Sequence, residues 1–207
     1  ARSRAIVNLG GFCNITVVPA GGAGSLAGVI GFDVCVCNQL LDAVAREALG
    51  VPFDDGGVAA LGGTADARAC GELRRVLLAQ RSAGRSLGTG DEAFAWVGAW
   101  KDRVSPADLA ASAAEAIGAV IAEAASDAQE VVVAGGGTHH AGVVGAIARG
   151  AGHRPKTTWD LGVPAEYREA AEMAVLGALC ADGVPITLPQ VTGVSDPAPI
   201  AGAWIRP

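Results

Sequence analysis

Three consecutive glycines, Gly135–Gly137, form the stretch of this sequence best suited to contact a ligand. They follow the β-branched run Val131–Val133, and helix-forming residues begin at Ala141. A buried strand, a glycine turn and a helix in this order bring the backbone close to a ligand at the carboxyl end of the strand. Glycine has no Cβ, so a phosphate, a ribose or a base could lie directly against these amides. A sharp turn that binds nothing would need the same glycines, and this stretch alone leaves both interpretations open.

A glycine pair, Gly10-Gly11, separates two predicted strands, Ala5–Val7 and Phe12–Val18. Two flexible residues let successive amides point toward an anion, and Asn8 and Asn14 flank the pair with side-chain donors. The pattern is typical of a phosphate contact, and an ordinary hairpin turn is the alternative. The segment from residue 22 to 27 (GAGSLA) matches a dinucleotide fingerprint, but it joins strand to strand, so we assign no nucleotide to it.

A carboxylate, Asp33, lies at the end of a third predicted strand, Leu26–Val34, where it could reach a ligand or a metal. The three strands are expected to form a β-meander with short hairpins. Asn38 then resembles the N-cap of a helix over Gln39–Leu49, and Gly50 is the glycine that commonly ends such a helix.

The remaining elements follow from the periodicity of apolar residues and from helix start signals. Ser105-Pro106 is a strong helix start, with an N-cap serine and proline at the first helical position. We expect further helices over residues 65–80, 92–100, 105–126, 141–149 and 164–180, strands over 131–134 and 156–159, and loops over 52–63, 81–91 and from 183 onward.

Composition limits the class of function. The chain has 207 residues, 51% of them hydrophobic, which is enough for the core of one large or two small domains. A net charge of −6 provides no basic stripe for nucleic acid, and no apolar run reaches the length of a membrane span. We see no leader that resembles a signal peptide. Five cysteines without CxxC or zinc-ligand spacing indicate reduced, mostly buried thiols, a cytoplasmic location and no metal site. A metal or redox site at Cys35 and Cys37, the only close pair, is the alternative.

Several motifs, in this order, resemble those of the anhydro-N-acetylmuramic acid kinases, in the carboxyl-terminal half of that family. Together they cover nearly all 207 residues. Ile6–Thr16 resembles LNIGGIANIT, Gly31–Asp42 resembles GFDTGPGNxLLD, Phe53–Gly62 resembles YDxxGxxAxxG, Thr89–Phe94 resembles TGREYF, Val133–His140 resembles VxGGGAxN, Leu161–Ala170 resembles the GIPxxxxEA segment, and Leu188–Gly193 resembles LPSVTG.

The resemblance implies an α/β fold, a ribonuclease-H-like lobe of the sugar kinase/actin-like ATPase superfamily, with a mixed sheet flanked by helices. Residues 1–207 would form this one carboxyl-terminal lobe. It also implies part of a kinase of cell-wall recycling that uses ATP and Mg²⁺, opens a 1,6-anhydro sugar with water and phosphorylates its 6-hydroxyl. By resemblance, the nucleotide-binding residues are Asn8, Gly10, Gly11, Asn14, Gly135, Gly136 and Gly137, and the substrate-binding residues are Asp33, Asn38 and Glu169.

The chain departs from the family pattern at three places of the predicted cleft. Val34–Cys37 replaces Thr-Gly-Pro-Gly, where valine and cysteine would fill the space that glycines leave for a substrate. Asp91 replaces an arginine, and His140 replaces an asparagine, beside His139. These changes favour an altered substrate or a chain that binds without catalysing.

The family's amino-terminal lobe, which by resemblance carries a GTSxDGxD loop and the general base, is absent from the sequence, so no catalytic residue is assigned. We therefore expect a partner: the missing lobe or another subunit, in a homo- or hetero-oligomer, with an amino sugar as substrate. Two functions remain open. One is half of an enzyme, and the other is a non-catalytic, pseudokinase-like subunit that pairs with a partner and retains nucleotide contact.

Overall fold

The structure, a computed structural model, describes residues 2–21, 26–82, 87 and 93–201. Its centre is a five-stranded sheet in the order β3-β2-β1-β4-β5. In the described sheet, β2 alone runs antiparallel to the other strands, because β1 pairs in parallel with β4 and β4 with β5. This mixed order is that of a ribonuclease-H-like lobe and confirms the predicted fold class. The strands are β1 Arg4–Leu9, β2 Phe12–Val18, β3 Ile30–Val36, β4 Glu130–Ala134 and β5 Lys156–Thr157.

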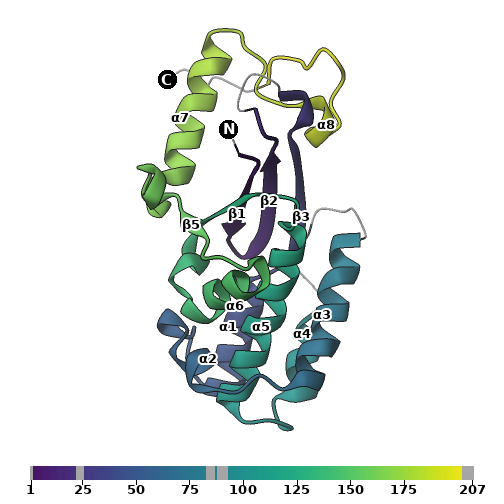
Figure 1. Ribbon diagram of the computed structural model, residues 1–207, viewed down its shortest axis with the longest axis vertical. Coiled ribbons are helices and arrows are strands. Elements are labelled where there is room, and N and C mark those ends of the chain that lie inside the picture. Colours follow the sequence, from purple (N-terminus) through teal and green to yellow (C-terminus); the bar gives the residue numbers. More distant parts are fainter. Residues whose placement is uncertain (1, 22–25, 83–86, 88–92, 202–207) are drawn as a thin grey trace, which may run out of the picture.

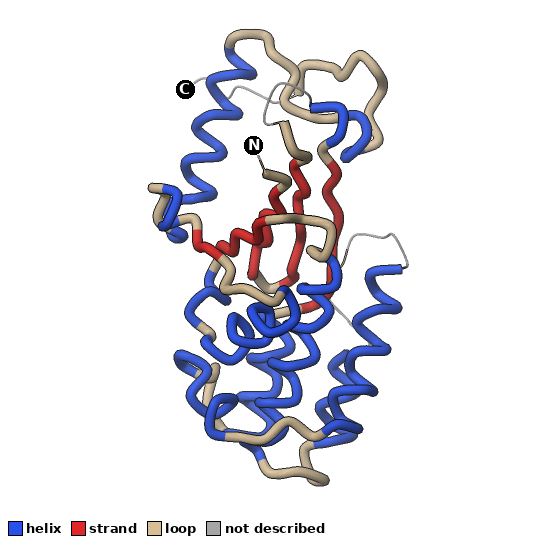
Figure 2. The backbone as a smooth tube through the Cα atoms, viewed as in Figure 1, coloured by secondary structure: helices blue, strands red, loops and turns tan. Residues whose placement is uncertain are grey.

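Most of the helices gather at one end of the molecule. Figure 1 shows α1 to α6 in the lower part, with α7 and α8 flanking the strands above, and Figure 2 shows the red strands between these two groups. The helices are α1 Asn38–Val44, which continues as a π-helical turn over Ala45–Leu49, α2 Val58–Gly62, α3 Ala67–Ser82, α4 Ala93–Trp100, α5 Pro106–Ala124, α6 Ala141–Ala151, α7 Arg168–Ala181 and α8 Pro189–Thr192.

The two faces of the sheet have different surroundings because side chains alternate along each strand. In β1, Ala5, Val7 and Leu9 are fully buried in the core, whereas Ile6 and Asn8 face the other side and are half-buried. Helices α3 and α5 contact β3 and cover the core side. The second face is therefore the one on which a polar site can be built.

Helix α5 is the central buried helix, and it begins as the sequence predicts. The Ser105 hydroxyl accepts a hydrogen bond from the Asp108 backbone amide at 3.1 Å, with Pro106 in the first turn. Gly118 lets α6 cross closely, since a Cβ there would lie 2.3 Å from the Ala146 Cβ. The α5–α6 contact therefore depends on small residues.

Two predicted boundaries near the sheet are wrong. Instead of one strand over Leu26–Val34, the chain forms a 3-10 turn at Leu26–Gly28 and a strand that runs on to Val36. Asn38 is the first residue of α1 and not its N-cap, which is Cys37 without a side-chain cap bond. Gly50 does end the helical segment in the left-handed conformation, as predicted.

Three further predictions differ from the structure, at residues 52–63, at the start of the helix predicted from Pro164, and in the loop predicted from residue 183. The loop predicted over residues 52–63 contains α2, because the Asp54 carboxylate accepts hydrogen bonds from the amides of Ala59 and Ala60, at 2.8 and 2.9 Å. The helix predicted from Pro164 starts as a 3-10 turn, and α7 begins at Arg168. The loop predicted from residue 183 likewise contains the short helix α8.

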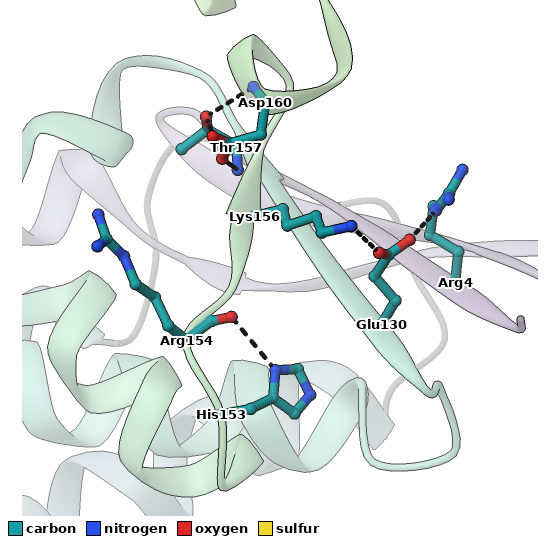
Figure 3. A network of polar contacts seen from close by, with 7 residues as sticks. All are labelled: Arg4, Glu130, His153, Arg154, Lys156, Thr157 and Asp160. Atoms are coloured by element: carbon teal, nitrogen blue, oxygen red, sulfur yellow. Dashed lines mark hydrogen bonds and ion pairs between the residues drawn. The ribbon is translucent and has the colours of Figure 1, made fainter.

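An ionic cluster joins the three neighbouring parallel strands β1, β4 and β5. The Glu130 carboxylate lies between Arg4 of β1 and Lys156 of β5, with both N–O distances at 2.5 Å (Figure 3). Hydrogen bonds from Lys156 and Arg4 hold the pKa of Glu130 below its usual value. Next to it, the Asp160 carboxylate accepts a hydrogen bond from the Thr157 amide at 2.7 Å and fixes the turn after β5.

The five cysteines are free thiols, and Cys13, Cys35 and Cys37 are buried, in line with the sequence prediction. Burial raises the pKa of Cys37 to about 12, which keeps that thiol protonated. Within the described part of the chain, no helix is long and apolar enough to cross a membrane.

Candidate functional site

A row of three polar residues crosses the sheet on the face away from the core. The strand register pairs Asn8 of β1 with Asn14 of β2, and Asn14 with Asp33 of β3. Residues that are directly opposite in neighbouring strands share a face. Val7 and Leu9, on either side of Asn8, are buried, so the row faces the open side. Three residues that are distant in the sequence are thus brought together.

Asp33 occupies the β3 end of this row and is half-buried. Its Oδ2 accepts a hydrogen bond from the Leu87 backbone amide at 2.9 Å. Leu87, in the connection between α3 and α4, therefore lies beside the row. Asp91, the charge reversal noted in the sequence, belongs to this segment and lies outside the described residues, as does most of the predicted loop over 81–91.

The Gly10-Gly11 turn holds the start of α1 against the β1–β2 hairpin. The Gly10 carbonyl accepts a hydrogen bond from the Asn38 amide at 3.0 Å, and the Gly11 carbonyl accepts from the amides of Cys37 and Gln39, at 2.9 and 3.3 Å. These carbonyl oxygens point into the protein, so an anion at the turn would have to be met by its amides. A Cβ at Gly11 would lie 3.1 Å from the Gln39 Nε2, so the turn packs tightly against that side chain.

The three glycines after β4 have different surroundings. Gly135 has φ +85° and comes so close to β1 that a Cβ would lie 2.7 Å from the Asn8 Oδ1. Gly137 is buried, and a Cβ there would lie 2.7 Å from the Leu9 Cβ. Gly136 is exposed, and the nearest atom to a Cβ there is the Asn38 Nδ2 at 3.8 Å. The missing side chains of Gly135 and Gly137 therefore let the turn pack against β1 and Asn38, whereas Gly136 faces open space.

Asn38 supports both parts of this arrangement. Its Nδ2 donates to the Leu9 carbonyl at 3.0 Å, at the end of β1. Its Oδ1 would lie 2.8 Å from a Cβ at Gly137, so the amide fits beneath the glycine turn. The side chain of Asn38 thus joins α1, β1 and the turn after β4.

Nine of the ten predicted binding residues meet at one end of the sheet, on strands β1 to β3, the start of α1 and the turn after β4. The exception is Glu169 in the first turn of α7, whose side chain is 77% exposed. The described ion pair of its carboxylate joins it to Arg168 at 3.5 Å. Gln39 also reaches the site, against Gly11, but the family motif leaves its position unspecified, so the sequence carried no signal for it.

The sequence placed His140 at the predicted cleft, and this prediction is wrong. It is 8% exposed and caps α6, because its Nδ1 accepts a hydrogen bond from the Val143 amide at 3.3 Å. Its Nε2 lies 3.7 Å from the Asp54 Oδ2, and Gly57 packs against the ring. Burial lowers the pKa of His140, and the nearby Asp54 carboxylate opposes this effect. The histidine replaces an asparagine in a structural position.

The interpretation of Val34–Cys37 as residues that fill the substrate space is also wrong. All four side chains are 0% exposed and belong to the hydrophobic core. The strand register shifts between Cys13 and Asn14, which marks a β-bulge where β3 turns inward. These side chains pack in the core behind the site.

Comparison with known families gives a match over residues 1–205 to the family described as anhydro-N-acetylmuramic acid kinase. The chain belongs to this family. A relative from Cupriavidus pinatubonensis named anhydro-N-acetylmuramic acid kinase is 34% identical over 220 residues, which cover 100% of this chain and 56% of the relative. Relatives of the same name from Salinibacter ruber and Xanthomonas campestris are 32% and 34% identical, and the chain covers 53% and 52% of their lengths, with 96% and 94% of its own residues matched. The chain spans just over half the length of these relatives.

The fold also resembles that of a solved structure from outside the family. The activator of the 2-hydroxyisocaproyl-CoA dehydratase from Clostridium difficile, determined with bound ADPNP, aligns with a TM-score of 0.49 and 15% sequence identity. The alignment covers 74% of this chain and 53% of that protein.

Proposed function

We propose that this chain forms one wall of the cleft of an ATP-dependent sugar kinase that opens a 1,6-anhydro amino sugar with water and phosphorylates its 6-hydroxyl. The reaction would serve cell-wall recycling in the cytoplasm. The observation that carries the proposal is the polar row of Asn8, Asn14 and Asp33 beside two glycine turns, in a chain of the anhydro-N-acetylmuramic acid kinase family.

The row and the turns offer the groups that a nucleotide needs. Asn8 and Asn14 carry amide donors suited to phosphate oxygens, next to the backbone amides of Gly10-Gly11. Gly136 leaves open space above Asn38, where an adenosine could lie flat against the backbone. In this proposal, the nucleotide lies along the open face of the sheet, between the two turns.

Magnesium fits this donor set as an ion that arrives with the nucleotide. Mg²⁺ is commonly held by one or two carboxylates together with substrate phosphates and water. Asp33 supplies one half-buried carboxylate in the row, and no group of three or more metal-binding side chains occurs among the described residues. The ion would neutralise phosphate charge, while the chain's own amides orient the phosphates.

The sugar side would be formed by Asp33, Asn38 and Glu169. Hydrolytic opening of the anhydro bridge requires a general base that takes a proton from water. The proposal places this base in the part of the family that the chain does not span, and it assigns Asp33 the role of accepting a hydrogen bond from a sugar hydroxyl. The exposed Glu169 would complete the sugar side when the cleft closes.

The proposal includes a partner, because this chain matches just over half the length of its relatives. The partner would be the remaining lobe, in the same polypeptide or in a second subunit. A non-catalytic subunit is the competing function. Its support came from changes at the cleft, and two of them, Val34–Cys37 and His140, are buried structural residues instead.

The test is turnover of ATP with 1,6-anhydro-N-acetylmuramic acid, followed by ADP release and by phosphorus NMR of the sugar phosphate. The sample is the full polypeptide or complex that contains residues 1–207, compared with residues 1–207 alone. We expect turnover in the former and none in the latter. No sugar phosphate from the complete protein would contradict the proposal and leave the non-catalytic subunit.

A matched pair of variants tests the assignment of Asp33. We expect Asp33→Asn to raise KM for the sugar with a smaller effect on kcat, and the exposed Asp55→Asn to leave both unchanged. Loss of kcat by a factor of about 10⁴ or more in Asp33→Asn, at unchanged KM, would show that Asp33 itself is the base and that the assignment to the missing lobe is wrong.

A further inference from the structure

Strand β3 forms one edge of the described sheet, and α3 packs against it (Figure 1). An edge strand presents backbone N–H groups that no neighbouring strand pairs. At the end of β3 such a group is buried, because Val36 is 0% exposed. Its amide donates to the Gln80 Oε1, in the last turn of α3, at 3.3 Å, and Gln80 is itself 4% exposed. A glutamine side chain therefore takes the place of a neighbouring strand at this point.

The chain that leads from Val36 into α1 is held on two sides. On the side of the β1–β2 hairpin, the Cys37 amide donates to the Gly11 carbonyl at 2.9 Å. The Asn38 amide donates to the Gly10 carbonyl at 3.0 Å. On the other side, the glutamine of α3 accepts from the Val36 amide. The position of Asn38, which the proposed function assigns to the sugar, is therefore set from both sides.

The end of α3 and the connection after it contact β3 at two further points. The Arg81 guanidinium lies over the Phe32 ring, 6.0 Å from the ring centroid. The Leu87 amide donates to the Asp33 Oδ2 at 2.9 Å. Together with the bond of Gln80, these contacts fasten the carboxyl-terminal half of β3 to α3 and to the residue that follows it.

A β-bulge close to these contacts makes the side-chain acceptor more important. The register of β2 with β3 shifts between Cys13 and Asn14, so the ladder is interrupted between Asp33 and Val36. The position of Asp33 relative to the end of β3 then depends on contacts from outside the sheet. Gln80 supplies a firm contact of this kind, because α3 is packed in the core along its inner face.

We propose that Gln80 is a positioning residue for the sugar side of the cleft. By holding the Val36 amide, it fixes the end of β3 and with it the positions of Asp33 and Asn38, while its own buried side chain touches no substrate. This inference rests on the proposed function, which assigns those two residues to the sugar. An apolar side chain at position 80 would leave a buried N–H without this acceptor, and the end of β3 would shift to find another.

The test compares three variants of the complete protein that contains residues 1–207. Gln80→Met nearly keeps the length of the side chain but has no oxygen, whereas Gln80→Glu keeps an acceptor oxygen at the same place. Trp96→Phe is the matched control, because it also removes a buried hydrogen bond of α3. That bond runs from the Trp96 Nε1 to the Ala69 carbonyl at 3.0 Å, in the first turn of the helix, away from Gln80.

Steady-state kinetics with 1,6-anhydro-N-acetylmuramic acid separate positioning from stability. We expect Gln80→Met to raise KM for the sugar by a factor of about 10, as loss of one buried hydrogen bond predicts, with a much smaller change in kcat. Gln80→Glu should recover most of this loss. Trp96→Phe should lower the urea midpoint of unfolding and leave KM unchanged. An unchanged KM in Gln80→Met, or an equal rise in Trp96→Phe, would overturn the inference.

Hydrogen exchange of the Val36 and Leu87 amides, read by NMR on the same variants, needs no turnover. Both amides should exchange several-fold faster in Gln80→Met than in the parent, and close to the parent rate in Trp96→Phe. Unchanged exchange of Val36 in Gln80→Met would overturn the inference. If the complete protein makes no sugar phosphate but both amides respond as expected, the proposed function fails, and Gln80 is retained as the residue that positions the end of β3.

Discussion

Replacing Gly136 with valine tests whether a nucleotide lies against the glycine turn. A Cβ at this position would lie 3.8 Å from the Asn38 Nδ2, an ordinary van der Waals distance, and φ of Gly136 is not in the left-handed region. The residue is exposed, so the change in the free energy of unfolding should stay within about 0.5 kcal/mol. The added side chain would, however, occupy the space assigned to adenosine.

Gly137→Ala is the comparison that makes this result interpretable. A Cβ there would lie 2.7 Å from the Leu9 Cβ and 2.8 Å from the Asn38 Oδ1. Overpacking of this kind costs about 1–3 kcal/mol of stability. Gly136→Val should therefore lose nucleotide binding and keep its stability, whereas Gly137→Ala should lose stability.

Urea unfolding and calorimetry with Mg-ATP measure the two effects. We expect Gly136→Val to unfold at nearly the parent's midpoint with an unchanged m-value, while the heat of nucleotide binding disappears. Gly137→Ala should shift the midpoint downward. If Gly136→Val binds Mg-ATP as tightly as the parent, no nucleotide lies at this glycine. If Gly137→Ala is as stable as the parent, the packing argument is refuted.

Three other predictions concern the core and its caps. Gly118→Val should destabilise by about 1–3 kcal/mol or more in thermal unfolding, because a Cβ there already meets the Ala146 Cβ at 2.3 Å; an unchanged Tm would contradict the close α5–α6 crossing. Burial lowers the pKa of His140 below its usual 6.5, against the pull of Asp54, so the unfolded chain takes up the proton first. The contribution of His140 to the free energy of unfolding should be complete above about pH 6.5 and should be lost as the pH falls from there to the lowered pKa. His140→Asn should keep the helix cap and remove this pH dependence, which urea unfolding at several pH values measures. The same pH profile for parent and variant would refute the role of His140. Cys37, buried with a pKa of about 12, should resist iodoacetamide at pH 8 until the protein unfolds, which peptide mass spectrometry measures; rapid labelling of folded protein would count against its burial.

Much of the fold can be predicted from local signals. The β-branched runs of Phe12–Val18 and Val131–Ala134, the cap at Ser105 and the glycine after α1 each act within a few residues, and the structure confirms them. Helix α2 escaped prediction because it is five residues long and its start depends on the Asp54 carboxylate, which the sequence cannot distinguish from a loop residue.

The site depends on longer-range geometry. Glycine turns and asparagines mark its components, but only the register of three strands shows that Asn8, Asn14 and Asp33 form one row. Strand alternation is interrupted by the β3 bulge, so the orientation of Val34–Cys37 could not be read from the sequence. The role of His140 depends on Asp54, 86 residues earlier in the chain.

The most direct test of the central claim, that this chain carries the nucleotide wall of the cleft, is an NMR titration of residues 1–207 with Mg-ATP. Weak, saturable shifts should concentrate at the backbone amides of Gly10, Gly11 and Gly135–Gly137 and at the side-chain amides of Asn8 and Asn14. The chemical shifts of the α7 amides, Arg168–Ala181, should not change. The claim would be contradicted if millimolar Mg-ATP left the chemical shifts of the glycine and asparagine amides unchanged. Chemical-shift changes confined to α7 would contradict it as well.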